Sequence, residues 1–116
     1  MQAVAAILRA KGIQVTSSWL NEHWDAGTTM DQIPPKELSE FAAQDLADIV
    51  SADTLILFSM DPMIPGVRGG RHVEFGYALG RGKRIIVVGV KENIFHYLLR
   101  VKHCTTIAEL LNIIGV

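Results

Sequence analysis

Two short apolar runs constrain what this chain can fold into more than any other feature of the sequence. Thr54–Phe58 and Arg84–Gly89 each have the length of one strand and carry apolar residues at consecutive positions, which is typical of strands buried on both faces of a sheet. The segment between them, Gly70–Arg81, is expected to form a helix. Strand, helix and strand in this order predict two parallel strands joined by a helical crossover.

The rest of the chain extends this alternation on both sides. A glycine ends the first expected helix, a Pro-Pro pair opens the second, and Thr106 with Glu109 forms a capping box at the last. The further elements that we expect are helices at Gln2–Lys11, Pro35–Ser51 and from Thr106 to Gly115, a strand at Ile13–Ser17, one or two helical turns within Glu92–Leu99, and an edge strand that includes Cys104.

This order of elements predicts an α/β fold in three layers, α/β/α, with a doubly wound parallel sheet. The 116 residues fit a single domain, 1–116. Doubly wound sheets normally start with a strand, whereas this chain starts with a helix, so we expect the first strand to be missing or truncated. Ligands of such sheets bind beyond the carboxyl ends of the strands, which places the functional edge at Ser18–His23, Ser59–Gly70 and Gly89–His96.

Composition excludes several classes of function. Eleven basic and twelve acidic side chains give a formal net charge of −1, which argues against capture of a nucleic acid polymer or an anionic membrane. The apolar runs are too short to span a bilayer. Cys104 is the single cysteine, so no internal disulfide is possible and a cytoplasmic setting is expected. No metal-ligand spacing relates the four histidines, which are His23, His72, His96 and His103.

Asp45 occupies an unexpected position on the helix Pro35–Ser51. At about 100° per residue it falls in the centre of the apolar stripe, where a carboxylate is costly unless it is hydrogen-bonded or lines a cavity. A structural alternative is that Asp45 reaches the rim of the helix or caps a neighbouring loop. Two other acids of this helix, Asp48 and Glu40, are expected to be ordinary surface charges. The stripe consists of Leu38, Phe41, Ala42, Ile49 and Ala52.

Glu74 follows a glycine pair at the start of the next helix, in Gly69-Gly70-Arg71-His72-Val73-Glu74-Phe75-Gly76. The glycines let the backbone approach a ligand, and free amides at a helix start favour an anion or a sugar hydroxyl. The alternative is an acid that interacts with the helix dipole, which is common. Asp45 and Glu74 lie on helices either side of the first apolar run, and two converging carboxyl groups suit chemistry at a glycosidic bond.

Much of the chain from Gly12 onward resembles the nucleoside 2-deoxyribosyltransferase-like superfamily. The Gly-Gly-(x)3-Glu-(x)-Gly motif, together with the upstream Asp45, carries this resemblance. The similar segments are Asp45–Ile49, Ala52–Ile56, Gly69–Leu79 and Gly82–Gly89, while Val15–Leu20 and Glu92–His96 look like small bacterial and phage-type members.

The resemblance implies a flavodoxin-like (Rossmann-like) fold and a homo-oligomer, a dimer or larger. It implies cleavage or transfer at the N-glycosidic bond of a nucleoside or nucleotide, without a metal or cofactor. Glu74 would be the nucleophile that forms a covalent glycosyl-enzyme intermediate, and Asp45 would assist proton transfer. Water as the second acceptor gives a hydrolase, and another base gives a transferase.

Six further residues are candidates for substrate binding. Trp19 follows the first expected strand, where it can stack on a base or close the edge of the core. Asn93 follows the strand Arg84–Gly89 and can reach the site or cap a helix. The remaining candidates come from the glycine-rich helix start and are Gly69, Gly70, Arg71 and His72.

Two other functions compete with this interpretation. One is a nucleotide-binding module of the same fold that has lost catalysis, which the missing first strand favours. The other is a phosphoribohydrolase of the lysine-decarboxylase-like group, whose turn usually carries Pro-Gly-Gly and a Thr before the Glu. Here Pro65-Gly66 stands apart from Gly70, and Val73 occupies the position of that Thr.

Overall fold

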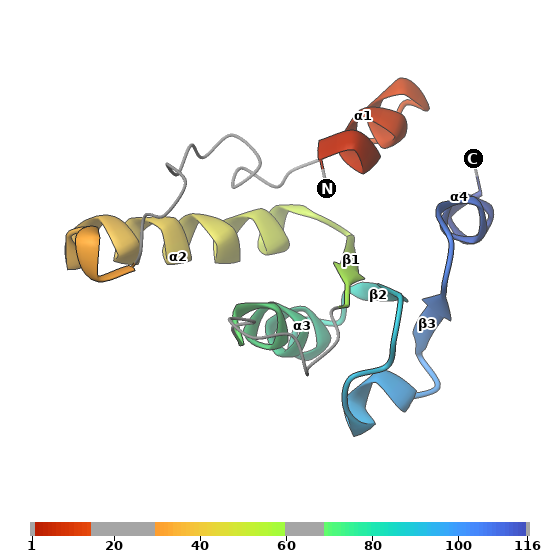
Figure 1. Cartoon of the computed structure of the whole chain (residues 1–116). Helices are drawn as coiled ribbons and strands as arrows, with labels where there is room; N and C mark the ends of the chain where they lie inside the picture. Colours follow the sequence, from red (N-terminus) through yellow and green to blue (C-terminus); the bar gives the residue numbers. More distant parts are fainter. Residues whose placement is uncertain (1, 15–29, 60–68, 116) are drawn as a thin grey trace. The chain divides into compact units, whose positions relative to one another are not determined.

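The computed structural model describes residues 2–14, 30–59 and 69–115 (Figure 1). Contacts divide the chain into two compact units, Met1–Ser51 and Ala52–Val116, which we describe separately. The first unit contains helices and the second contains the parallel sheet. The prediction of a single domain over 1–116 stays a prediction.

The first unit contains α1 (Gln2–Ala10), the short 3-10 helix η2 (Met30–Gln32) and α2 (Pro35–Ser51). Helix α1 ends as predicted at Gly12, which has a φ of +82°. The Ile13 amide donates to the Leu8 carbonyl at 3.0 Å, which is the pairing of a Schellman motif and explains why glycine stands there. Of the strand expected at Ile13–Ser17, the first two residues are not in a strand and the rest lie outside the described residues.

Helix α2 has the predicted bounds and begins with Pro35, whose missing amide proton costs nothing at a first helical position. Its buried side chains differ from the prediction. Asp48, expected at the surface, is buried together with Ile49, whereas Asp45 is half-buried. Asp48 is accommodated because the Gln44 side-chain amide donates to its carboxylate at 3.0 Å, which offsets part of the cost of burying a charged group.

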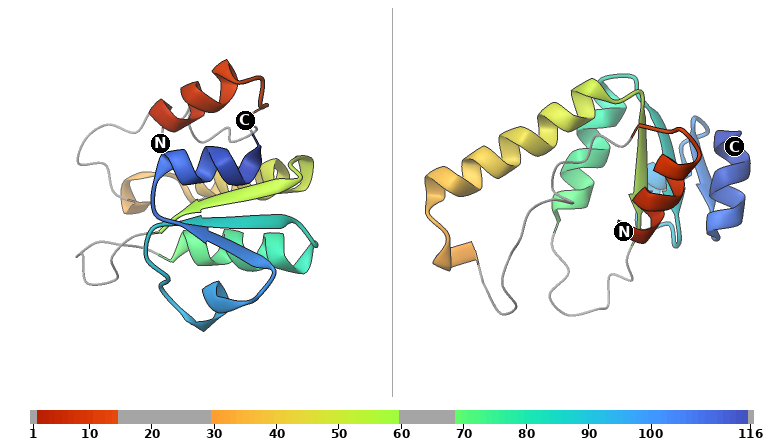
Figure 2. Two further views of the ribbon diagram at one scale, coloured as in Figure 1. Left: turned by 90° about the vertical axis from the view of Figure 1, so that its right-hand side faces the viewer. Right: turned by 90° about the horizontal axis from the view of Figure 1, so that it is seen from above.

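The second unit confirms the α/β prediction in its coarse form, as a parallel sheet flanked by helices. Its sheet has three strands in the order β1-β2-β3, all parallel. Helices α3 and α4 cover opposite faces of this sheet (Figure 2). The elements are β1 (Thr54–Phe58), α3 (Gly70–Gly80), β2 (Arg84–Val88), the 3-10 helix η3 (Ile94–Tyr97), β3 (Val101–Cys104) and α4 (Ile107–Ile114).

Strand β2 forms the centre of the core. Ile86 and Val87 are fully buried, because β2 has a paired strand on each side and a helix on each face. The prediction that β1 is buried on both faces is wrong within the described structure. Only Leu57 of that strand is buried, since β1 lies at one edge of the described sheet. Strand β3 forms the other edge, as expected for the segment with Cys104.

Helix α4 begins with the predicted cap. The Thr106 hydroxyl oxygen accepts a hydrogen bond from the Glu109 amide at 3.1 Å. The Glu109 carboxylate returns to the Thr106 hydroxyl at 3.2 Å, where an ideal capping box would use the backbone amide. Gly115 closes the helix with a φ of +92°, as expected of a C-terminal glycine.

The carboxyl ends of the three strands lead into Ser59, Gly89 and Thr105. The Ser59 amide donates to the Val88 carbonyl at 3.0 Å, and the Gly89 amide donates to the Cys104 carbonyl at 2.9 Å. Gly89 has a φ of +111°, and a Cβ atom there would lie 2.6 Å from the Ser59 hydroxyl oxygen. Both the backbone conformation and the space therefore require glycine at this edge.

We predict that Gly89→Ala destabilises the protein by at least about 1–2 kcal/mol, because alanine disfavours positive φ and its methyl group meets Ser59. Gly76→Ala is the matched control, since a Cβ atom at this position in α3 meets nothing within 4 Å. It should stabilise the protein by roughly 0.5–1 kcal/mol through helix propensity. Urea unfolding followed by circular dichroism measures both, and equal stability of the two variants would contradict the prediction.

Candidate functional site

The first turn of α3 lies beside the segment that follows β2, at the carboxyl edge of the sheet. This is shown by Arg71 and Glu92, which are 21 residues apart in the sequence and form an ion pair. Arg71 Nε donates to the two carboxylate oxygens of Glu92 at 3.1 and 3.0 Å, and an Nη nitrogen also contacts Oε1. The pair is bidentate, which is the strongest geometry that arginine and a carboxylate adopt.

The Arg71–Glu92 pair is removed from water. The side chain of Glu92 is 2% exposed and that of Arg71 is 14% exposed. The hydrogen bonds to Glu92 raise the pKa of Arg71 above its ordinary value, with burial opposing and the Glu92 charge adding to the effect. Because breaking a buried pair leaves an uncompensated charge at a cost of about 3–5 kcal/mol, this interaction fixes the first turn of α3 against the segment after β2.

His72 and Asn93 extend the cluster on its more exposed side. The Asn93 side-chain oxygen accepts from the Phe95 amide at 3.0 Å and so caps η3. This fixes the Asn93 amide nitrogen as the donor toward His72 Nδ1, in a long contact of 3.4 Å. The proton of neutral His72 then lies on Nε2, 3.8 Å from a carboxylate oxygen of Glu92.

His96 is the buried member of the cluster, with 1% of its surface exposed. Its Nδ1 accepts a hydrogen bond from the Glu92 backbone amide at 3.1 Å. Its ring packs against Phe75 of α3, with centroids 4.8 Å apart. Burial lowers the pKa of His96, and the nearby Glu92 carboxylate opposes that shift. His96 therefore stays neutral near pH 7.

Three predicted binding residues, Arg71, His72 and Asn93, are thus brought together. Glu74 lies one turn further along α3 and is half-buried. It neighbours Arg71 and Ala78 on the helix surface and borders the side that is buried against the sheet.

The remaining predicted residues are not joined to this cluster. Gly69 and Gly70 lie at its edge and are exposed, and a Cβ atom at either would meet nothing within 4 Å. Neither has a positive φ, so the expected sharp turn does not depend on glycine at these two positions. Asp45 belongs to the first unit, so its convergence with Glu74 stays a prediction. Trp19 lies outside the described residues.

The carboxyl group of Asp45 has a raised pKa. Its Oδ1 is buried and has no hydrogen-bond partner within the described ranges. Burial raises the pKa of this carboxyl, and the negative charge of Asp48 one turn away raises it further. A carboxyl group with these properties holds its proton to a higher pH than an ordinary Asp, which suits a group that transfers protons.

Glu92 and His96 were not predicted as partners of Arg71. A signal was present, because an acid and a histidine one turn apart follow directly on a buried strand, and such side chains fall at the carboxyl edge of a parallel sheet. What the sequence does not give is the long-range pairing between α3 and this segment.

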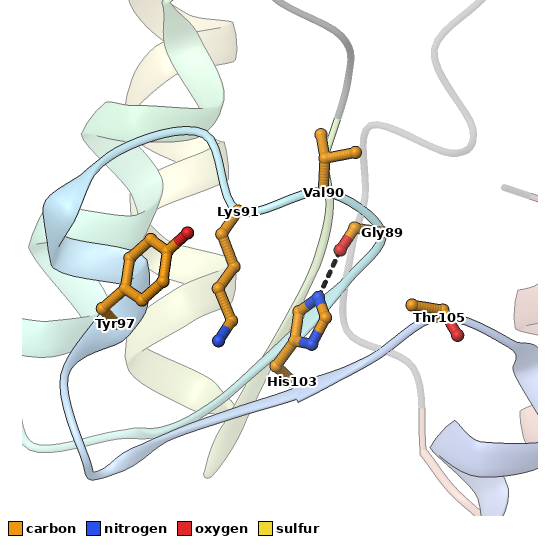
Figure 3. Close-up of a pocket in the computed structure, with 6 residues that line it drawn as sticks. All are labelled: Gly89, Val90, Lys91, Tyr97, His103 and Thr105. Carbon is orange, nitrogen blue, oxygen red and sulfur yellow. Dashed lines mark hydrogen bonds between the residues drawn. The ribbon is translucent and has the colours of Figure 1, made fainter.

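A separate open hollow of about 520 Å³ lies where β2 and β3 end (Figure 3). In it the Lys91 ammonium lies 4.4 Å from the centroid of the Tyr97 ring, and His103 Nε2 hydrogen-bonds the Gly89 carbonyl. None of the individual catalytic or binding candidates lines this hollow, although its first three lining residues belong to the predicted functional edge Gly89–His96. Its lining is formed by Gly89, Val90, Lys91, Tyr97, His103 and Thr105.

Other kinds of site find no support in the part of the chain that the structure describes. Residues 2–14, 30–59 and 69–115 contain no group of three or more His, Cys, Asp or Glu arranged to hold a metal ion. None of their helices is both long and apolar enough to cross a membrane. Cys104 is buried, and burial raises the pKa of its thiol, which lowers its reactivity as a nucleophile.

We predict that Arg71→Met destabilises the protein by about 3–5 kcal/mol, because Glu92 is left buried without its cation. The double variant Arg71→Met/Glu92→Met should recover most of this loss, since both charges are gone. Arg81→Met is the control, because Arg81 is exposed and its guanidinium lies over the Tyr77 ring, a contact worth about 0.5–1 kcal/mol. Urea unfolding checks all three variants, and a double variant no more stable than Arg71→Met would contradict the prediction.

No protein-family model, curated protein or solved structure matches this chain. The resemblance to the nucleoside 2-deoxyribosyltransferase-like superfamily therefore rests on the sequence motifs.

Proposed function

We propose that this chain cleaves or transfers the N-glycosidic bond of a nucleoside, with Glu74 as the nucleophile, on a flavodoxin-like scaffold. The supporting observation is that Arg71, His72 and Asn93, which the sequence nominated for substrate binding, cluster at the start of α3, at the carboxyl edge of a parallel sheet. Glu74 follows one turn later on the same helix. This edge is where α/β sheets bind their ligands.

The chemistry requires one nucleophile and one proton donor. The Glu74 carboxylate attacks the anomeric carbon, the bond from that carbon to the base nitrogen breaks, and the base leaves with its bonding electrons. An acid protonates the leaving base, a role that the raised pKa of Asp45 suits. Water or a second base then attacks the anomeric carbon of the glycosyl ester and releases Glu74.

The state of Arg71 favours a nucleoside over a nucleotide. Glu92 accepts from Nε and one Nη nitrogen of Arg71, so a 5′-phosphate that used these donors would have to displace Glu92, whose side chain is 2% exposed. Leaving that charge unpaired costs about 3–5 kcal/mol, whereas one hydrogen bond to a charged group contributes about 1.5–3 kcal/mol. The exchange is unfavourable, so these donors of Arg71 serve the structure of the site, and the charge that Arg71 could offer to a phosphate is already balanced by Glu92.

We expect Glu74→Gln to reduce base release by at least about a thousandfold, because the amide cannot form the glycosyl ester. Asp45→Asn should reduce it by about 10²- to 10⁴-fold, the usual contribution of general acid catalysis. The assay incubates the protein with the four common deoxynucleosides and separates free base by chromatography. Glu40→Gln removes an exposed acid and should retain full activity. Full activity of Glu74→Gln would refute the proposed nucleophile.

We further expect deoxynucleosides to be better substrates than their 5′-monophosphates, because Arg71 is neutralised by Glu92. Comparing kcat/KM for the two series measures this preference. Incubation of each substrate in buffer without the protein gives the background of base release. Binding of either series without base release would favour the non-catalytic module. Base release from monophosphates alone would favour the phosphoribohydrolase alternative and contradict the preference.

A further inference from the structure

His96 is the buried member of the cluster that contains Arg71, Glu92, His72 and Asn93, and its side chain has no chemical role in the function proposed above. It is among the largest fully buried side chains of the described residues. It lies in η3, one turn beyond Glu92, and its ring contacts Phe75 of α3. A histidine in this position joins the two elements that carry Arg71 and Asn93.

The hydrogen bond to His96 requires one protonation state. The Glu92 amide donates to Nδ1, so Nδ1 must carry a lone pair and the proton of the neutral ring must lie on Nε2. Protonation of the ring places a hydrogen on Nδ1, which then faces the hydrogen of the Glu92 amide. The imidazolium form therefore cannot keep this hydrogen bond.

Glu92 passes the effect of His96 to Arg71. The Glu92 backbone amide is held by His96, while the Glu92 carboxylate holds the Arg71 guanidinium in a bidentate pair. Asn93, the next residue, holds His72. Losing the bond at the Glu92 amide thus loosens the backbone that presents both contacts to α3.

The charges around His96 come from three elements. Glu92, on the segment after β2, favours the imidazolium form. Arg71 and His72 on α3 and His103 on β3 disfavour it, and burial disfavours it most of all. His96 Nε2 has no hydrogen-bond partner within the described ranges, so no acceptor found there compensates the added positive charge that its N–H group carries in the imidazolium form.

We propose that His96 is a positioning residue, which in its neutral form alone holds Glu92 and, through it, Arg71 at the carboxyl edge of the sheet. Acidification then releases the segment from Glu92 to Tyr97 from α3. This inference concerns the control of the site and does not depend on the chemistry assigned to Glu74.

The direction with pH follows from the lowered pKa of His96 in the folded protein. The unfolded chain binds the proton more readily than the folded one, so stability rises with pH in the interval between the two pKa values. The contribution of neutral His96 is complete above about pH 6.5, the pKa of an unperturbed histidine. It is lost as the pH falls through the folded-state pKa.

The test is a pH titration by NMR of the full chain labelled with ¹⁵N. At pH 7.5 we expect His96 in the Nε2–H form, with a slowly exchanging Glu92 amide and a resolved Arg71 Nε–H signal. As His96 becomes protonated below pH 6.5, the protection of the Glu92 amide, which is its exchange rate compared with that of an unstructured amide at the same pH, should fall by about tenfold or more as the local structure opens. The Arg71 Nε–H signal should broaden with the same midpoint, while the β2 amides remain protected.

Two variants separate this role from ordinary packing. His96→Phe keeps an aromatic ring against Phe75 but has no acceptor, so the Glu92 amide should be weakly protected at every pH, compared with an unstructured amide at the same pH. His72→Gln is the matched control, because His72 faces the same pair without accepting the Glu92 amide. It should keep the transition.

Three results would overturn the proposal. The first is a neutral His96 with its proton on Nδ1. The second is a Glu92 amide and an Arg71 signal that stay protected after His96 is protonated. The third is a transition in His96→Phe with the midpoint of the unaltered protein. If His96→Phe does not fold, the titration of the unaltered chain still decides the question through the first two results.

Discussion

The buried Arg71–Glu92 ion pair is the constraint on which the carboxyl edge of the sheet depends. Charged side chains are buried only when they are paired, and here the two charges come from α3 and from the segment after β2. If either element shifts, Arg71 or Glu92 is left as a buried charge without its partner. The pair therefore fixes α3 relative to the sheet and leaves the cluster with little net charge of its own.

The elements of the fold were predictable because their signals are local. The bounds of α2 follow from a Pro pair at its start, and β1 follows from five consecutive residues of strand type. The glycines at positions 12 and 115 end helices through a backbone conformation that few other residues adopt. Burial was harder to predict, because it depends on neighbours in space. Thus β1 is an edge of the described sheet, and Asp48 is buried where helical periodicity placed it at the surface.

The candidate site was predictable in part for the same reason. Arg71 and His72 were predicted as binding residues because they lie at the glycine-rich helix start. Asn93 was predicted because it follows a buried strand. The partner of Arg71 was not predictable, since Glu92 lies 21 residues away and only the packing of α3 on the sheet brings them together. Helical periodicity identified Asp45 as an acid on an apolar stripe, but it does not say which surface that stripe meets.

A site whose cation is already neutralised must select its ligand by shape and hydrogen bonds. His72 and Asn93 suit that task, because the cap on η3 fixes the orientation of the Asn93 amide and with it the tautomer of His72. Donors and acceptors that are fixed in position discriminate against a ligand that cannot pair with them, which an apolar pocket does far less. A sugar carries hydroxyl groups that both donate and accept hydrogen bonds. For the nucleoside proposed above, His72 and Asn93 can therefore recognise the sugar through hydrogen bonds and without an ion pair.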